Sequence, residues 1–338
     1  MLDIENARSL ISYLRLRGHI GDDEKAQVEV LRGGVSNKTV CVQRECGTAW
    51  VLKQALPKLR VASEWFSDPA RIWVEAKALR MLPQIAPIGV ITPFVFEDRS
   101  ANLLCMEAVP FPHENWKQLL LSGKLELNHV QKFAEILASI HANGYKHREQ
   151  YSREFQDRTF FETLRLEPYY RFSAQSVPAA RPFLEELVSA TLARTDTVVH
   201  GDFSPKNILI HSDRMILLDH EVVHFGDPAF DVGFSLTHLL SKAHFLTKTS
   251  PGFLKAAGLY WRTYYSNISE LPWANELEQR VIRHTIGCLL SRAAGRSPLE
   301  YFTSQHKTRQ TGIALKLIDA FPSSTEDLIF QYGRNIQP

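Results

Sequence analysis

Apolar and polar positions change their spacing about one third of the way along the chain. Residues 27–56 carry short apolar or alternating runs separated by glycines, which predicts two strands, a Gly33-Gly34 turn and a third strand that ends near Lys53. Residues 102–112 read as a further strand that runs into a connector broken by prolines. The first third of the chain therefore favours an antiparallel β-sheet.

One segment of this strand-rich part has the signature of a helix. In residues 67–83, Asp68 can cap the N-terminus, Pro69 fits the first helical position and Pro83 ends the helix. We therefore expect a single strong helix beside the sheet.

Helical spacing dominates the rest of the chain. In residues 128–145 the apolar side chains fall on one face, and Gly144 is expected to stop the helix. A short hairpin is predicted for Ile208–Ile210 with Met215–Leu218. The pattern predicts an α+β protein of two lobes, an N-lobe of residues 1–108 and a mainly helical C-lobe of residues 109–338, divided near residues 107–111. Further helices are expected at residues 234–246, 252–265 and 276–295.

Composition narrows the class of protein. The 338 residues are 44% hydrophobic and 22% charged, which is ordinary for a globular chain, and 39 basic against 37 acidic residues give a net charge of only +2. We therefore expect neither a nucleic-acid nor a membrane partner, and no apolar run is long enough to span a bilayer. The start of the chain lacks the pattern of a signal peptide. Four scattered cysteines, expected to be free buried thiols, favour a reducing, cytoplasmic location: Cys41, Cys46, Cys105 and Cys288.

The densest group of reactive side chains lies in residues 198–221. Asp202 and Asn207 have the spacing D-x-x-x-x-N, and Asp219 follows the next predicted strand. Phosphoryl transfer needs a carboxylate near the attacking hydroxyl and hard oxygen ligands for Mg²⁺. The spacing therefore indicates Asp202 as the group that faces the nucleophile, with Asn207 and Asp219 as metal ligands.

The longer string around these residues resembles the aminoglycoside phosphotransferase and choline kinase superfamily. Its members share H-G-D-x-x-x-x-N, then D-x-E one hairpin later, then G-D-P-x-x-D. The resemblance implies a protein-kinase-like fold, ATP or GTP as co-substrate with Mg²⁺, and Asp202 as the catalytic base. It leaves the role of Glu221 open between metal shell and substrate site, and that of Asp231 between substrate site and loop support. The matching residues are His200, Gly201, Asp202, Asn207, Asp219, Glu221, Gly226, Asp227, Pro228 and Asp231.

The N-lobe offers candidates for binding the nucleotide. Gly33 and Gly34, followed by Ser36 and Asn37, could let backbone amides approach phosphate oxygens. Lys53 could bind the phosphates of the nucleotide. Glu75 lies on the apolar face of its predicted helix, where a carboxylate needs a partner, and Lys53 is the natural one. In family terms, residues 103–111 resemble the hinge strand, which implies that Met106, Glu107 and Val109 surround the adenine.

The acceptor stays open at this level. Residues 52–79 and 287–302 also resemble methylthioribose kinases, but the loop asparagine, Asn207, is typical of the wider superfamily. There is no room for the activation segment of a protein kinase, which favours a small hydroxylated acceptor. Glu221 and Asp231 would suit a cationic acceptor, whereas Arg292 and Arg296 would suit an anionic or sugar acceptor. Two other functional classes remain open, a two-metal hydrolase and a catalytically silent nucleotide-binding module. The sequence also leaves open whether the protein is a monomer or a homodimer.

Overall fold

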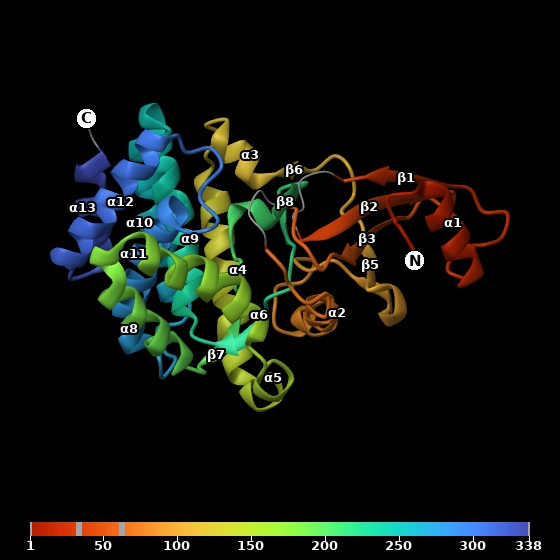
Figure 1. The fold of residues 1–338 in the computed structure, drawn as a ribbon, viewed down its shortest axis with the longest axis horizontal. Coiled ribbons are helices and arrows are strands. Elements are labelled where there is room, and N and C mark those ends of the chain that lie inside the picture. Colours follow the sequence, from red (N-terminus) through yellow and green to blue (C-terminus); the bar gives the residue numbers. More distant parts are fainter. Residues whose placement is uncertain (1, 32–35, 61–64, 337–338) are drawn as a thin grey trace.

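The N-lobe is a five-stranded antiparallel sheet flanked by two helices. A computed structural model describes residues 2–31, 36–60 and 65–336, and Figure 1 shows this sheet at one end of the molecule. The strand order is β1-β2-β3-β5-β4, which confirms the strands expected before Lys53 and after residue 102. The elements of this lobe are α1 (Ala7–Leu16), β1 (Ala26–Val30), β2 (Asn37–Arg44), β3 (Ala49–Ala55), α2 (Arg71–Met81), β4 (Phe94–Asp98) and β5 (Leu103–Glu107).

The two faces of the sheet belong to separate apolar clusters. Helix α1 buries Leu10 and Leu14 with Val40 and Leu52 on one face. Helix α2 buries Ile72 and other apolar side chains in a second cluster, and this cluster continues into the C-lobe. The apolar packing therefore holds α2 against both lobes, which matters because α2 carries Glu75.

The C-lobe packs long helices around α9 and α11, which make extensive mutual contact. Helices at residues 128–145, 234–246, 252–265 and 276–295 were expected, and α4, α9, α10 and α11 confirm them. Among the described residues, no helix combines the length and apolar character needed to cross a membrane. The helices are α3 (Trp116–Leu121), α4 (Leu127–Lys146), α5 (Arg148–Glu154), α6 (Thr159–Phe161), α7 (Phe172–Ser176), α8 (Arg181–Leu192), α9 (Ala229–Phe245), α10 (Ser250–Ser266), α11 (Leu277–Ala294), α12 (Ser304–Asp319) and α13 (Thr325–Ile336).

Short strands at the junction of the lobes carry the polar segment 198–221. The predicted hairpin is present as β8 (Ile208–His211) and β9 (Arg214–Leu217), turning at Ser212 and Asp213, both of which have positive φ. Strand β6 (Glu114–Asn115) pairs with β8 in antiparallel fashion, and β7 (Thr197–Val199) pairs in the same way with β10 (His224–Gly226). Figure 1 shows β6 and β8 between the sheet and the helices.

Several local expectations are wrong. Two helices, α1 and α2, flank the sheet where a single one was expected, and Pro69 lies two residues before the first residue of α2. Asp68 does not cap α2; its carboxylate accepts from the amide of Ala70 in the turn before the helix. Gly144 lies inside α4 and does not end it. A Cβ at this position would lie 2.8 Å from Oγ1 of Thr197 and 3.0 Å from the Val198 side chain, so the glycine lets α4 pack closely on β7. Cys46 is exposed, whereas the other three thiols are buried as expected.

Close contact between α9 and α11 depends on a glycine. A Cβ at Gly233 would lie 2.6 Å from the Cβ of His284 and 2.8 Å from the amide nitrogen of Thr285. We predict that Gly233→Ala lowers the free energy of unfolding by about 1–3 kcal/mol through overpacking, as measured by urea denaturation. The matched control is Gly312→Ala on α12, where a Cβ meets nothing within 4 Å; it should raise stability by about 0.5–1 kcal/mol. Equal effects of both variants would contradict the packing argument.

Candidate active site

A cavity of about 790 Å³, which we call the cleft, brings most of the predicted site residues together. It takes its walls from β2 and β3, from the chain after β5, from the segment 202–221 and from α9 and α11. Gly33 and Gly34 lie outside the described residues. The predicted site residues that line the cleft are Ser36, Asn37, Lys53, Met106, Glu107, Val109, Asp202, Asn207, Asp219, Glu221 and Arg292.

Lys53 joins two carboxylates from different parts of the chain. Its Nζ lies 2.6 Å from Oε1 of Glu75 on α2 and 3.0 Å from Oδ1 of Asp219. Burial alone would lower the pKa of Lys53, but the charges of Asp219 and Glu75 outweigh it and hold that pKa well above its ordinary value. Glu75 has no solvent-accessible surface, and burial raises its pKa to about 7 although Lys53 opposes the shift. The predicted Lys53–Glu75 pair is thus present.

Asp219 adopts an unusual backbone conformation where it follows β9. Its φ is +67°, in the left-handed region that non-glycine residues seldom occupy. The amide of Leu218 donates to the carbonyl of Asn207, which sets the two predicted metal ligands side by side in the backbone. Burial would raise the pKa of Asp219, but Lys53 and then Lys206 lower it well below its ordinary value. The carboxylate is therefore ionised in the cleft.

Asp202 is fixed through one of its two oxygens. The side-chain Nδ2 of Asn207 donates to Oδ2 of Asp202 at 2.8 Å and to the backbone carbonyl of Asp202 at 3.0 Å. A guanidinium nitrogen of Arg165 lies 3.0 Å from the same Oδ2. Arg165 also donates to the carbonyl of Gly201. Both partners converge on Oδ2, so Oδ1 is the oxygen left to face a ligand. The amide nitrogen of Asn207 is engaged, which leaves its carbonyl oxygen as a hard ligand for a cation.

Asp231 lies outside the cleft and supports the loop that carries Asp202. Its side chain has no accessible surface, and its oxygens accept from the amides of His200 at 2.6 Å and Gly201 at 2.8 Å. His141 on α4 lies 3.3 Å from the same carboxylate. A substrate role for Asp231 does not fit this position, because its oxygens are already used by the backbone. The geometry therefore favours the role of holding the loop over a role in binding the substrate.

Two buried histidines form a directed chain behind the loop. The amide of Asp202 donates to Nδ1 of His200, whose Nε2 lies 3.1 Å from Nδ1 of His220. Burial lowers the pKa of both imidazoles, so both are neutral. Because Nδ1 of His200 accepts, its Nε2 carries the hydrogen and donates to His220. His200 therefore orients the backbone at Asp202 rather than carrying a proton to a ligand.

Glu221 is neutralised by an arginine that sequence analysis did not single out. Arg71, at the start of α2 and without accessible surface, donates to Oε2 of Glu221 at 3.1 Å and to the carbonyl of Ser36. Asn37 is 3.5 Å from the same oxygen. Arg71 lies four residues before Glu75 on the buried face of the helix, a spacing that could have revealed it.

The segment after β5 presents free backbone groups to the cleft. The amide of Glu107 donates to Pro93 and that of Ala108 to Ala49, so these two donors are engaged. Among the described backbone hydrogen bonds, none engages the amide of Val109. The carbonyl of Glu107 and the amide of Val109 together form an acceptor and donor pair of the kind that a purine edge can meet.

The geometry tests the hydrolase alternative. Within the described ranges, no three side chains of His, Cys, Asp or Glu lie close enough to hold a metal ion between them. His200 and His220 bond to each other, and Asp231 bonds to the backbone. The histidine–aspartate cluster that a two-metal hydrolase needs is therefore not formed by these residues.

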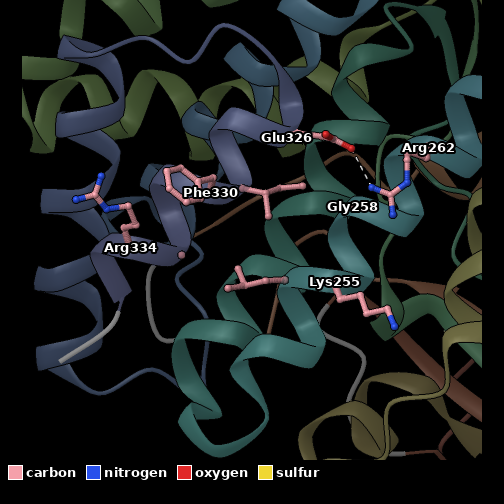
Figure 2. Close-up of a pocket in the computed structure, with 9 residues that line it drawn as sticks. Lys255, Gly258, Arg262, Glu326, Phe330 and Arg334 are labelled. Carbon is pink, nitrogen blue, oxygen red and sulfur yellow. Dashed lines mark hydrogen bonds and ion pairs between the residues drawn. The ribbon is translucent and has the colours of Figure 1, made fainter.

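A second hollow lies far from these groups, between α10 and α13. Its volume is about 470 Å³, and Figure 2 shows Lys255, Arg262, Glu326 and Phe330 at its edges. Arg262 and Glu326 form an exposed ion pair across it, 2.9 Å apart. Exposed pairs of this kind bind weakly, and no described buried polar group opens into the hollow. The chemistry of the molecule lies in the cleft.

Comparison with known families identifies the class of protein. The model described as the phosphotransferase enzyme family matches residues 27–271. Methylthioribose kinase 2 of Oryza sativa subsp. japonica is 26% identical over 264 residues, which cover 69% of this chain and 61% of that protein. Methylthioribose kinase of Exiguobacterium sibiricum is 23% identical over 298 residues, which cover 79% and 74%. The chain thus spans about three fifths of the length of the rice relative.

Solved structures show the same fold at low identity. Ethanolamine kinase of Plasmodium vivax has a TM-score of 0.59 at 12% identity, covering 93% of this chain and 90% of that one. Macrolide 2'-phosphotransferase MphH of Brachybacterium faecium has a TM-score of 0.55 at 15% identity, covering 97% and 98%. Amicoumacin kinase hAmiN, solved with AMP-PNP and Ca²⁺, has a TM-score of 0.57 at 15% identity, covering 94% of each chain. These likenesses confirm the predicted α+β, kinase-like fold.

A buried lysine near the cleft provides a test of the electrostatics. Lys242 on α9 has no accessible surface, and burial, followed by the charge of Lys117, lowers its pKa from 10.5 to about 7. The pKa of Lys242 is about 7 in the folded protein and 10.5 in the unfolded chain. The buried charge therefore lowers the free energy of unfolding by its full amount below pH 7, and this loss disappears as the pH rises to 10.5. We predict that Lys242→Met raises the free energy of unfolding by roughly 3–4 kcal/mol at pH 6.5, and by almost nothing near pH 10.5.

The measurement is urea denaturation of wild type and variant across this pH range. The control is Lys255→Met, an exposed lysine on α10, which should show no such pH-dependent gain. A constant difference between wild type and Lys242→Met at every pH would contradict the burial argument.

Proposed function

The chain belongs to the phosphotransferase enzyme family, and we propose that it transfers the γ-phosphate of ATP or GTP to a hydroxyl group of a small molecule. One observation supports this proposal above all. Lys53, held by Glu75 and Asp219, lines the same cleft as Asp202 and Asn207. A cation for the phosphates, a carboxylate for the acceptor and oxygen ligands for a metal are the parts that phosphoryl transfer needs.

Asp202 is proposed as the group that orients the acceptor hydroxyl and takes its proton. Asn207 and Arg165 hold Oδ2, so Oδ1 can accept the hydrogen of the incoming hydroxyl. The guanidinium of Arg165 keeps negative charge on Asp202 balanced before the acceptor binds. As the acceptor oxygen bonds to phosphorus, its proton passes to Oδ1 and the nucleoside diphosphate leaves.

Asn207 and Asp219 are proposed to hold Mg²⁺ with the nucleotide. When bound, the ion neutralises the charge of the phosphate oxygens during transfer. The carbonyl oxygen of Asn207 fits this role because its amide nitrogen is already engaged by Asp202. Asp219 fits because it is ionised and its Oδ2 remains beside the oxygen that Lys53 occupies.

The nucleotide is proposed to lie along the N-lobe side of the cleft. Lys53 would contact its phosphates, with Ser36 and Asn37 nearby in the cleft wall. The Glu107 carbonyl and the Val109 amide would meet the purine edge, and Met106 would pack beside the base. ATP and GTP present different hydrogen-bonding edges there, so nucleotide competition would separate them.

A thiosugar is a second candidate acceptor. The relatives named methylthioribose kinase are 26% and 23% identical to this chain, which supports it. An aminoglycoside, another sugar or an amino alcohol is the broader alternative, and the family membership supports all of these equally. Nucleotide consumption measured over a panel of these acceptors would separate them.

We predict that Asp202→Asn lowers kcat/KM for the acceptor by about 10²–10⁴-fold, because the amide cannot take the hydroxyl proton. The affinity for Mg·ATP, measured by calorimetry, should change by less than about threefold, a ratio worth under 1 kcal/mol. Asp213→Asn is the matched control: Asp213 is exposed at the turn of the β8–β9 hairpin, and asparagine tolerates its positive φ. Turnover at the wild-type rate in Asp202→Asn would remove Asp202 from this role.

We also predict that Glu75→Gln raises KM for Mg·ATP by about tenfold, because Lys53 loses one of the two carboxylates that orient it. The effect should appear in nucleotide affinity, with the acceptor KM unchanged. Glu97→Gln serves as the control, since Glu97 pairs with Arg80 on the lobe surface. An unchanged Mg·ATP KM in Glu75→Gln would show that Asp219 alone holds the lysine.

A further inference from the structure

The C-lobe side of the cleft is rich in cations. We call this part the acceptor end and define it by Lys117, Lys206, His238, Arg292 and Glu300, all of which line the cleft. They come from α3, the catalytic loop, α9, α11 and the segment after α11. Residues distant in sequence therefore supply positive charge to one place.

The carboxylates of the segment 202–221 and of the acceptor end already have cationic partners. Asp202 is paired with Arg165, Asp219 with Lys53 and Glu221 with Arg71. Glu300, the acid of the acceptor end, forms a close ion pair with Lys117. A cationic acceptor would have to compete with these arginines and lysines for every described carboxylate of the acceptor end and catalytic loop.

Two cations of the acceptor end have no carboxylate partner among the described residues. Arg292 contacts the carbonyl and hydroxyl of Ser297 and lies 3.5 Å from the hydroxyl of Tyr169. Its Nε is buried without a hydrogen-bond partner in the described part of the chain. No ion pair in that part joins Lys206, which is exposed in the cleft, to an acid. The charge of Arg292 is available to a ligand, and that of Lys206 lies within reach of Asp202 and Asp219 as well.

A buried and unpartnered histidine lies among these cations. His238 is 5% exposed and lines the cleft, and its Nε2 has no hydrogen-bond partner among the described residues. Burial lowers the pKa of His238 well below its ordinary value, and the charges of Lys242, Arg292, Lys117 and Lys206 add to the effect. A buried polar atom without a partner is costly unless a ligand supplies one.

Lys242 adds charge from behind the histidine. It lies one helical turn after His238 on α9 and donates to the carbonyl of His238 at 3.3 Å. No ion pair in the described part of the chain joins it to a carboxylate. Arg292 and Lys206 therefore act on one neutral imidazole, together with Lys117, which is paired with Glu300, and Lys242, which is only partly protonated near pH 7. This arrangement favours a negatively charged group and disfavours a positive one.

We propose that the acceptor of this kinase carries an anionic group, a carboxylate or a phosphate, which binds at the acceptor end between Arg292, Lys206 and His238. This inference rests on the proposed function, because it takes the hydroxyl to be phosphorylated to lie beside Asp202 in the same cleft. It chooses between the two acceptor classes left open by the sequence. Glu221 and Asp231 are occupied within the protein, whereas Arg292 has no carboxylate partner in the described part of the chain.

The test compares ligands that share one hexose ring and differ in charge. Each is titrated by calorimetry into the full-length protein that has been saturated with Mg·AMP-PNP, so that the phosphate sites of the nucleotide are filled. D-glucuronate or D-glucose 6-phosphate should bind at least about tenfold tighter than D-glucose and D-glucosamine. Preference between the first two identifies the anion as carboxylate or phosphate, and either preference supports the inference.

Variants locate the binding. Arg292→Gln and, separately, Lys206→Gln should each weaken binding of the preferred anion by about tenfold and leave D-glucose unaffected. Lys206 is exposed, so its variant remains informative if loss of Arg292 disturbs folding. Lys255→Gln, an exposed lysine at the distant hollow in Figure 2, should bind like wild type.

The outcomes separate the inference from the function on which it rests. Equal or tighter binding of D-glucose or D-glucosamine, no measurable binding of either anion, or unchanged binding in both variants would overturn the inference alone, provided that Mg·AMP-PNP binds. Failure of Mg·AMP-PNP to bind would contradict the proposed function, and the inference with it.

Discussion

The contact of Lys53 with two carboxylates is the interaction on which the cleft depends. Glu75 comes from the helix packed on the sheet, and Asp219 comes from the end of the β8–β9 hairpin. One ammonium group therefore ties strand β3, helix α2 and the catalytic segment together. Asp219, the partly exposed acid of the two, is the one that a divalent cation in the cleft could also contact.

The parts of the site that lie close in sequence could be predicted. Asp202 and Asn207 are five residues apart, and their hydrogen bond follows from a loop spacing visible in the chain. The Lys53–Glu75 pair was also within reach, because a carboxylate on an apolar helix face needs a partner and Lys53 ends the preceding predicted strand. Strands β1, β2, β3 and β5 and helices α2, α4, α9, α10 and α11 followed from local apolar patterns, whereas α1, α8, α12 and α13 were not predicted.

Contacts between distant segments could not be predicted in this way. Arg71 and Glu221 are 150 positions apart, and nothing in either neighbourhood indicates the other. Arg165 lies in the π-helical segment Glu162–Arg171, whose hydrogen-bonding pattern follows neither of the periods used for prediction. Lys242 is placed in a helix whose other residues give no sign that it would be buried without a counter-charge. Arg71 and Arg165 pair with carboxylates of the cleft, and Lys242 lies behind His238. The net charge around the cleft could therefore be worked out only from the fold.

The support of the catalytic loop by Asp231 has a mechanical consequence. Asp231 belongs to the first turn of α9 and holds the backbone at positions 200 and 201, while His141 fixes it to α4. Asp202, the proposed base, is thus anchored by two core helices, whereas Lys53, proposed to bind the phosphates, reaches the C-lobe through its ion pair with Asp219. A displacement of strand β3 would therefore move Lys53 and leave Asp202 in place.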